Sequence, residues 1–124
     1  MTKPLVSIIT PCYNGEAFLK RYFESILNQT YPNLELIFIN DGSTDRTEEI
    51  ALSYRERLEK RGITYIYEKQ ENAGQAAALN RGLKLFTGEY LTWPDSDDEM
   101  VSDAVEKKVD YLEQHPDYGF CICK

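Results

Sequence analysis

A chain of 124 residues has the length of a single domain, and its formal net charge of −7 argues against the basic stripe with which proteins bind a nucleic-acid backbone. No apolar run reaches the length of a membrane span, and the first residues lack a signal-peptide core. With 42% hydrophobic and 28% charged residues, the composition is that of an ordinary globular protein, for which a cytoplasmic location is expected.

Strands and helices alternate along the sequence. Apolar runs predict strands at 5–10, 34–39, 63–67, 89–92 and 118–123, and helical periodicity predicts helices at 18–27, 46–60, 73–86 and 101–114. In the third of these helices, the spacing places Ala76, Leu79, Leu83 and Phe86 on the inner face. Strands that alternate with helices of this length imply a three-layer α/β/α fold, in which helices cover both faces of a mainly parallel, doubly wound sheet.

Acidic turns follow two of the predicted strands. Asp41 comes after strand 34–39, and the cluster Asp95-Ser96-Asp97-Asp98 follows strand 89–92. Along an extended backbone Asp95 and Asp97 point the same way, and two carboxylates can hold Mg²⁺ or Mn²⁺ while leaving coordination positions open for phosphate oxygens. Turn formation or helix capping is the alternative explanation of such a cluster.

Ligands of open α/β sheets bind at the carboxyl ends of the strands. The turn after strand 5–10, Asp41 and the acidic cluster would all lie at this one edge, whereas turn residues without a function would decorate both edges. A nearby pair, Asp45 and Glu48, has the spacing of a helix capping box, for which we predict a mostly structural role.

Six short segments occur in a specific order and at specific separations. They are VSIITPCYN at 6–14, QTYPNLE at 29–35, NDGSTD at 40–45, NAG at 72–74, NRG at 80–82 and DSDD at 95–98. Over nearly the whole chain, this series resembles the nucleotide-sugar-binding half of a family 2 glycosyltransferase with the A-type fold. The resemblance implies a single nucleotide-sugar-binding domain over residues 1–124, as the N-terminal part of a longer enzyme.

The resemblance also implies roles for individual residues. Tyr13 would offer an aromatic face to the base, Asp41 would accept a hydrogen bond from the ring N–H of a uracil-like base, and Asp97 would bind the divalent metal, Mn²⁺ or Mg²⁺, on the diphosphate. The nucleotide-sugar site as a whole would comprise Pro11, Tyr13, Glu16, Asp41, Gly74, Asn80, Asp95 and Ser96. Asp98 would be an auxiliary ligand or, as we prefer, a cap of the following helix.

Two positions depart from the pattern of the family. Asn40 stands where an aspartate is usual, and Pro94 stands where an apolar strand residue is usual. Proline removes a backbone donor, so the fourth strand is expected to end by Trp93. Neither change touches the predicted ligands directly, but both bear on the shape of the pocket and therefore on the identity of the donor.

The implied activity is metal-dependent transfer of a sugar from a nucleoside-diphosphate-sugar, with a UDP-sugar favoured, to an acceptor hydroxyl with inversion, in polysaccharide or glycoconjugate synthesis. The metal would stabilise the charge that develops on the leaving diphosphate. The general base and the acceptor segment are expected beyond Lys124. The chain alone is therefore predicted to bind the donor without turnover, and to form a homodimer through its last helix and strand.

Other protein classes fit the sequence less well. A response-regulator receiver domain would need paired acids after the first strand, where the chain has Pro11-Cys12, and an aspartate after the third strand, where it has Glu68-Lys69. A phosphate-loop NTPase would need a Gly-x-x-x-x-Gly-Lys-Ser/Thr run, and a sugar-phosphate nucleotidyltransferase would need a basic, glycine-rich loop after the first strand; the sequence has neither. A non-catalytic nucleotide-binding or interaction module of the same fold stays open as an alternative.

Overall fold

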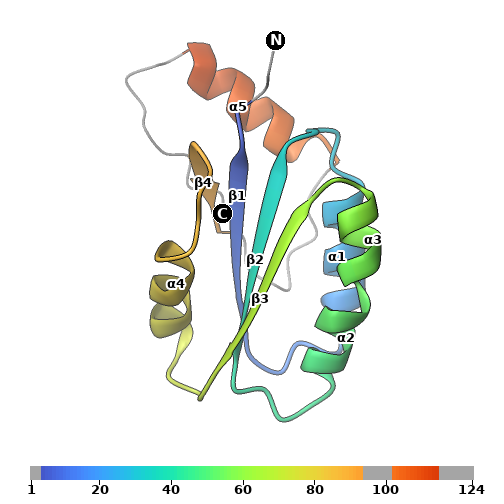
Figure 1. The fold of residues 1–124 in the computed structure, drawn as a ribbon, viewed down its shortest axis with the longest axis vertical. Coiled ribbons are helices and arrows are strands. Elements are labelled where there is room, and N and C mark those ends of the chain that lie inside the picture. Colours follow the sequence, from blue (N-terminus) through green and yellow to red (C-terminus); the bar gives the residue numbers. More distant parts are fainter. Residues whose placement is uncertain (1–3, 94–101, 115–124) are drawn as a thin grey trace.

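The computed structural model describes residues 4–93 and 102–114, which form a parallel sheet with helices on both faces (Figure 1). The strands are β1 (Val6–Cys12), β2 (Leu34–Asp41), β3 (Thr64–Gln70) and β4 (Tyr90–Thr92), in the spatial order β3-β2-β1-β4. The helices are α1 (Leu19–Leu27), α2 (Thr47–Ser53), α3 (Arg55–Lys60), α4 (Gln75–Leu83) and α5 (Ala104–Gln114). The predicted α/β architecture is confirmed, and the predicted strand 118–123 lies outside the described residues.

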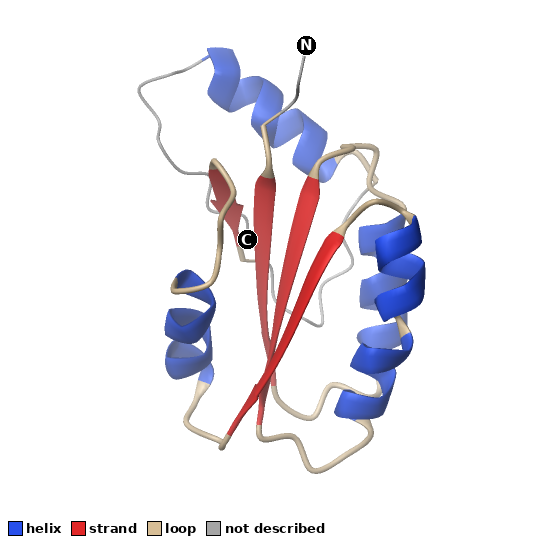
Figure 2. Cartoon of the chain, in the orientation of Figure 1, coloured by secondary structure: helices blue, strands red, loops and turns tan. Residues whose placement is uncertain are grey.

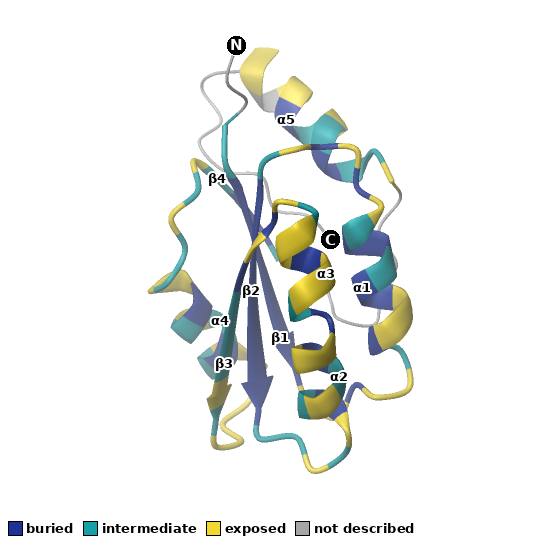
Figure 3. Cartoon of the chain, turned by 45° about the vertical axis from the view of Figure 1, so that its right-hand side comes forward, coloured by how far each residue is buried: buried dark blue, intermediate teal, exposed yellow. Residues whose placement is uncertain are grey.

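The two middle strands, β1 and β2, are buried along their whole lengths (Figure 3). Because helices cover both faces of the sheet, side chains on either side of these strands enter apolar surroundings. This is why both strands are nearly continuous apolar runs in the sequence. The edge strand β3 is only partly buried, and it carries more polar residues accordingly.

Two hydrophobic cores of unequal size lie on the two faces of the sheet. The larger core joins the sheet to α1, α2, α3 and α5, and at its centre the Phe23 ring stacks on Phe38 and Tyr54, with ring centroids 5.5 and 4.8 Å apart. The smaller core lies beneath α4 and is built from Ile9, Ile37, Ile39, Ala78 and Leu91. Figure 2 shows α4 on the opposite side of the sheet from α1, α2 and α3.

The predicted helix 46–60 is two helices in the structure. The interruption lies at Tyr54, which ends α2 and precedes α3 with φ −90° and ψ −6°. The Tyr54 ring is buried against Phe23, and its hydroxyl donates to Glu24 Oε2 at 2.9 Å. The predicted inward face, which included Leu58, is otherwise maintained across the break.

The prediction for the inner face of α4 was half right, because Leu79 and, just past the helix, Phe86 pack against the smaller core. Ala76 and Leu83 are exposed, whereas Ala78 and Gly82 are buried against the sheet. A Cβ atom on Gly82 would lie 2.4 Å from Ile9 Cγ2, so α4 approaches β1 along a face that only a glycine permits. A pattern search that scores apolar side chains cannot detect such a face, because its central residue has no side chain.

None of the helices in residues 4–93 and 102–114 combines the length and the apolarity that a bilayer crossing requires.

Candidate functional site

Strands β1, β2 and β3 end side by side at one edge of the sheet. In the observed register Cys12 pairs with Asn40, and Asp41 pairs with Gln70. The loops that lead to α1, α2 and α4 leave this edge, which lies at the bottom of Figure 1. An open pocket of about 530 Å³ on the same edge is lined by Gly42, Ser43 and residues 69–72. The turn after β1 and Asp41 therefore share the edge at which ligands of such sheets bind.

Asp41 is the last residue of β2, which runs two residues further than the predicted strand 34–39. Only 3% of Asp41 is exposed. Its Oδ1 accepts hydrogen bonds from Gln70 Nε2 and the Ala73 amide, both at 2.9 Å, and its Oδ2 accepts from the Gly74 amide at 3.0 Å. Asn72 Nδ2 donates to the Asp41 carbonyl oxygen at 3.1 Å and lies 3.5 Å from Oδ2. The carboxylate thus fastens the β3–α4 loop to the end of β2.

The charge of Asp41 is stabilised by this loop. Burial alone would raise the pKa of Asp41, but the hydrogen bonds from Gln70, Ala73 and Gly74 favour the ionised form more strongly, and the pKa is lowered. Gly74 directly precedes α4 with φ +98°, a backbone conformation that other residues rarely adopt. An ionised Asp41 therefore accepts from the two amides, of Ala73 and Gly74, that directly precede α4.

Asn40 is fully buried, and its amide is used as both acceptor and donor. Its Oδ1 accepts from the Ser43 amide at 3.0 Å, its Nδ2 donates to the Tyr67 hydroxyl at 2.9 Å, and that hydroxyl donates to Glu48 Oε2 at 3.0 Å. Burial is the main cause that raises the pKa of Tyr67 to about 12, so the hydroxyl keeps its proton. An aspartate at position 40 could not donate to Tyr67, which gives a local reason for the departure from the family pattern.

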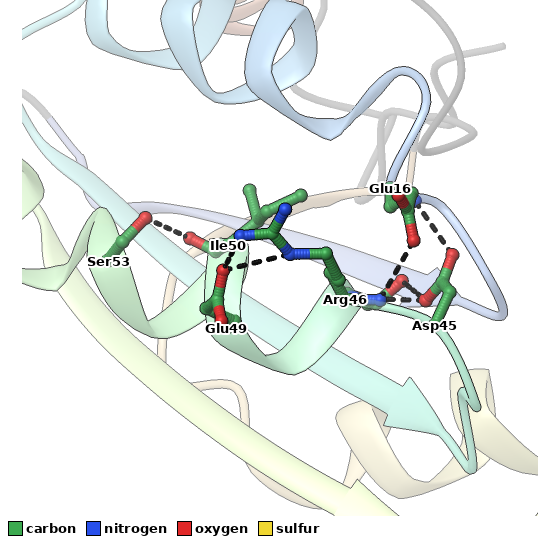
Figure 4. A network of polar contacts seen from close by, with 7 residues as sticks. Glu16, Asp45, Arg46, Glu49, Ile50 and Ser53 are labelled. Carbon is green, nitrogen blue, oxygen red and sulfur yellow. Dashed lines mark hydrogen bonds and ion pairs between the residues drawn. The ribbon is translucent and has the colours of Figure 1, made fainter.

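Glu16 and Asp45 join the β1–α1 loop to the β2–α2 loop (Figure 4). The Glu16 amide donates to Asp45 Oδ2 at 3.1 Å, and Glu16 Oε1 accepts from the Arg46 amide at 3.0 Å. The Glu16 carboxylate, which we predicted to line the nucleoside pocket, is therefore bound to a neighbouring loop in this structure.

The predicted capping box is only half formed. Asp45 lies one residue before the N-cap, Arg46, and its Oδ1 accepts at 2.9 Å from the amide of Thr47, the first residue of α2. Glu48 does not bond back toward Asp45, because its Oε2 accepts from the Tyr67 hydroxyl and lies 3.6 Å from Lys69 Nζ. The structural role predicted for Asp45 is confirmed, and the second half of the box was wrong.

The remaining predicted residues divide between the carboxyl edge and other places. Pro11 is buried within β1, and Tyr13, just past the strand, is 51% exposed at the edge. Asn80 is exposed on α4, about 9 Å along the helix from Gly74 by the rise of an α-helix. The structure therefore brings Pro11, Tyr13, Asp41 and Gly74 to one edge and leaves Asn80 further along α4.

Asp95, Ser96, Asp97 and Asp98, with Pro94, lie outside the described residues, so their predicted roles stay predictions. Within residues 4–93 and 102–114, no group of three or more His, Cys, Asp or Glu residues is placed to hold a metal ion. The partners of Asp41, namely Gln70, Asn72 and Ala73, were missed as site residues. The NAG segment at 72–74 contains two of these partners, Asn72 and Ala73, but only its glycine was predicted as a site residue.

A family model described as glycosyl transferase family 2 matches residues 7–123. The chain belongs to this family. A glycosyltransferase of Haemophilus influenzae is 42% identical over 127 residues, covering 98% of this chain and 50% of the relative. One of Rickettsia typhi is 45% identical over 109 residues, covering 88% of this chain and 32% of the relative. The chain thus spans about a third to a half of the length of these relatives.

Solved structures of glycosyltransferases share the fold. TarS of Staphylococcus aureus, solved as residues 1–349 with UDP-GlcNAc, matches with a TM-score of 0.82 and 26% identity over 90% of this chain and 32% of that chain. The mannosyltransferase PcManGT of Pyrobaculum calidifontis, solved with GDP-Man and Mn²⁺, matches with a TM-score of 0.80 and 30% identity over 90% of this chain and 33% of that chain. The family and the A-type fold predicted from the sequence are confirmed, and the receiver-domain, NTPase and nucleotidyltransferase alternatives are set aside.

Proposed function

We propose that this protein is the donor-binding part of a metal-dependent glycosyltransferase that takes a sugar from a nucleoside-diphosphate-sugar, a UDP-sugar, and transfers it to an acceptor hydroxyl with inversion. The observation that carries the proposal is the carboxyl edge of the sheet, where the exposed Tyr13 and the ionised Asp41 stand in a family 2 chain whose structural neighbours were solved with UDP-GlcNAc and GDP-Man.

The described residues can supply recognition of the base. Tyr13 has an exposed aromatic ring on which a base can stack. On Asp41, Oδ1 has two close donors, whereas Oδ2 has one close donor, the Gly74 amide, and the long contact to Asn72. Because a carboxylate oxygen accepts two hydrogen bonds, Oδ2 is the atom with capacity for the N–H of a uracil ring, once Asn72 gives up its 3.5 Å contact.

The metal role belongs to residues outside the described ranges. In this proposal Asp97 holds Mn²⁺ or Mg²⁺, which would stabilise the charge that develops on the departing diphosphate. Asp95 and Ser96 contact the ribose and the sugar, and Glu16 and Asn80 complete the site. The PcManGT neighbour solved with Mn²⁺ supports the choice of cofactor. The base that deprotonates the acceptor is assigned to the part of the relatives that this chain does not span, and the chain itself is proposed to bind the donor without turnover.

For the biological setting we propose polysaccharide or glycoconjugate synthesis. The glycosyltransferase TuaG of Bacillus subtilis, whose description names teichuronic acid biosynthesis, is 37% identical over 89% of this chain and 42% of its own length. This relative supports a role in polysaccharide synthesis. A cytoplasmic location and a homodimer belong to the same proposal.

The test is calorimetry of the chain with UDP and UDP-GlcNAc, and with GDP-mannose as competitor, in the presence and absence of Mn²⁺. We expect metal-dependent binding of UDP and UDP-GlcNAc that Asp97→Ala removes. We expect Tyr13→Ala to weaken binding about tenfold, because stacking of one base on an aromatic ring contributes about 1–3 kcal/mol.

A matched control is Tyr111→Ala on α5, since Tyr111 is 50% exposed and Tyr13 is 51% exposed. Equal losses in the two tyrosine variants would contradict a base site at Tyr13. Binding that Asp97→Ala leaves unchanged would show that the acidic cluster only caps a helix, and it would favour a non-catalytic module.

A further inference from the structure

The loop that carries Tyr13 is fastened to the β2–α2 loop by its own backbone. Three consecutive amides of the first loop each donate to a different side chain of the second loop or of Thr47, the first residue of α2: Asn14 to Ser43 Oγ at 2.9 Å, Gly15 to Thr47 Oγ1 at 2.8 Å and Glu16 to Asp45 Oδ2 at 3.1 Å. Amides in a loop of this kind lack helix or strand partners, so these side chains satisfy donors that would otherwise need water.

The fastening is reciprocal, because amides of the second loop donate to side chains of the first. The Thr44 amide donates to Asn14 Oδ1 at 2.8 Å, and the Arg46 amide donates to Glu16 Oε1 at 3.0 Å. We call these five hydrogen bonds between residues 14–16 and 43–47 the two-loop clasp. Figure 4 shows its Glu16, Asp45 and Arg46 portion.

The clasp determines the backbone next to Tyr13. Asn14 has φ +51°, a left-handed conformation that is uncommon for any residue but glycine. Its side chain is held by the Thr44 amide on one side while its own amide is held by Ser43 on the other. The Tyr13 ring is half exposed and the chain that carries it is fastened on its C-terminal side.

We propose that Asn14, Ser43 and Asp45 are positioning residues that hold Tyr13 ready to stack on the nucleotide base, an inference that rests on the proposed function above. An aromatic ring whose backbone is fixed before binding loses less conformational entropy when the ligand arrives. The serine and the final aspartate of the NDGSTD segment then act on the donor through Tyr13 and make no contact with it themselves.

The experiment is a double-mutant cycle in which the measured quantity is the affinity of each variant for UDP. Asn14→Gly keeps the left-handed backbone accessible and removes only the acceptor for Thr44. Asp45→Asn leaves one oxygen for the two backbone amides, of Glu16 and Thr47, from which the Asp45 carboxylate accepts, and its amide nitrogen opposes the other donor. Each variant is expected to weaken UDP binding about tenfold in the unaltered background, the effect of roughly 1.4 kcal/mol.

The decisive comparison repeats both substitutions in a Tyr13→Ala background. If the clasp acts through Tyr13, Asn14→Gly and Asp45→Asn have no further effect there, because coupled residues are not additive. Fully additive losses would overturn the proposal and leave the clasp with a general structural role. Glu49→Gln is the control, since it breaks an exposed ion pair with Arg46 on the same helix without touching the clasp, and it should bind UDP as the unaltered chain does.

Amide hydrogen exchange separates this proposal from the proposed function, because it needs no nucleotide. The amides of Asn14, Gly15, Glu16 and Thr44 should exchange slowly in the unaltered chain and faster in Asp45→Asn. Fast exchange at these amides in the unaltered chain would show that the clasp does not form, and the proposal would be overturned. Slow exchange together with no binding of UDP or GDP would instead overturn the proposed function, and with it the ligand assigned to Tyr13.

Discussion

At the scale of single residues, Asp41 holds a loop only in its ionised form. Its two oxygens together accept from one side-chain amide and two backbone amides, and a protonated carboxyl would place an O–H against one of these donors. The pKa of Asp41 is lowered despite its burial, which means that folding favours the charged form.

We predict that Asp41→Asn lowers the free energy of unfolding by about 2 kcal/mol at neutral pH, because a buried charged hydrogen-bond group is replaced by one that opposes a backbone donor. The pKa of the folded state lies below the ordinary value of 3.8, so the contribution of Asp41 is present above that pH and is lost as the pH falls through the folded pKa. Urea denaturation of the unaltered chain and of Asp41→Asn, from pH 7 down to pH 3, measures the difference in their free energies of unfolding.

Two other carboxylates, Glu24 and Asp45, also have lowered pKa values, so the unaltered chain loses stability in acid for several reasons. The difference between the two chains isolates Asp41, and it should shrink below pH 3.8. A difference that stays constant with pH would mean that the charge of Asp41 does not matter. Glu56→Gln, at an exposed position of α3, should show no such difference.

The sequence predicted the places of these carboxylates but not their partners. Asp41 and Asp45 could be singled out because they follow a buried apolar strand and precede a helix. Their partners are mostly backbone N–H groups, which every residue except proline carries. The residue types in the sequence therefore do not indicate which N–H groups will donate. For the same reason the hydrogen bond from the Arg46 amide to the Glu16 carboxylate was not predicted, and the assignment of Glu16 to the nucleoside pocket stays a prediction.

At the scale of elements, the short strand β4 depends on an anchor at its beginning. Glu35 of β2 is almost fully buried, and its carboxylate accepts from Ser7 Oγ at 2.7 Å, from the Thr87 amide at 2.9 Å and from the Thr87 hydroxyl at 2.8 Å. The Gly88 amide in turn donates to Ser7 Oγ at 2.9 Å. This network ties the turn before β4 to the middle of the sheet.

We predict that Glu35→Leu lowers the free energy of unfolding by about 3 kcal/mol, because it removes the acceptor of three donors, the Ser7 hydroxyl and the amide and hydroxyl of Thr87. Glu35→Gln should cost much less. Its carbonyl oxygen can still accept from Ser7 and the Thr87 amide, and its nitrogen can donate to the Thr87 hydroxyl. Urea denaturation measures both changes, and exchange of the Thr87 and Gly88 amides reports on the anchor locally.

Equal losses in the leucine and glutamine variants would contradict this prediction, since they would show that the charge of Glu35 matters and its hydrogen bonds do not. Glu89→Gln is the control, because Glu89 is exposed and lies next to the anchor.

Element types were easier to predict than element ends. The four strands that the structure describes were all predicted. The middle strands β1 and β2 were the plainest, because strands covered on both faces have to be apolar runs. The outer ends of the α2–α3 pair were predicted to within one residue, but the break between α2 and α3 and the ends of α4 were not. The break lies at Tyr54, whose ring stacks on Phe23 in a tertiary contact. In sequence, the uninterrupted helical spacing of Ile50, Tyr54 and Leu58 gives no sign of a break.

At the scale of the whole molecule, the two faces of the sheet are covered very differently. Among the described helices, α1, α2, α3 and α5 contribute to the larger core, whereas α4 alone packs on the smaller one. The position of α4 also matters for the site, because Gly74 and the loop bound by Asp41 lie at its N-terminal end. Contact between α4 and β1 therefore links the smaller core to the carboxyl edge of the sheet.

We predict that Gly82→Ala lowers the free energy of unfolding by about 1–2 kcal/mol. Alanine favours a helix over glycine by about 1 kcal/mol, but forcing a methyl group into a packed interface costs about 1–3 kcal/mol. At Gly82 the cost should prevail, because the new Cβ would lie 2.4 Å from Ile9 Cγ2 and 3.3 Å from two further atoms of Ile9, on a central strand that cannot easily move.

Ala76→Gly supplies the comparison within the same helix, because position 76 is exposed and reports the helix preference alone. Alanine should be the more stable choice at position 76, and glycine at position 82. If thermal and urea denaturation find alanine more stable at both positions, α4 does not approach β1 as closely as the structure has it. A more stable glycine than alanine at position 82 would show that this face of α4 packs on β1 only without a side chain at that position.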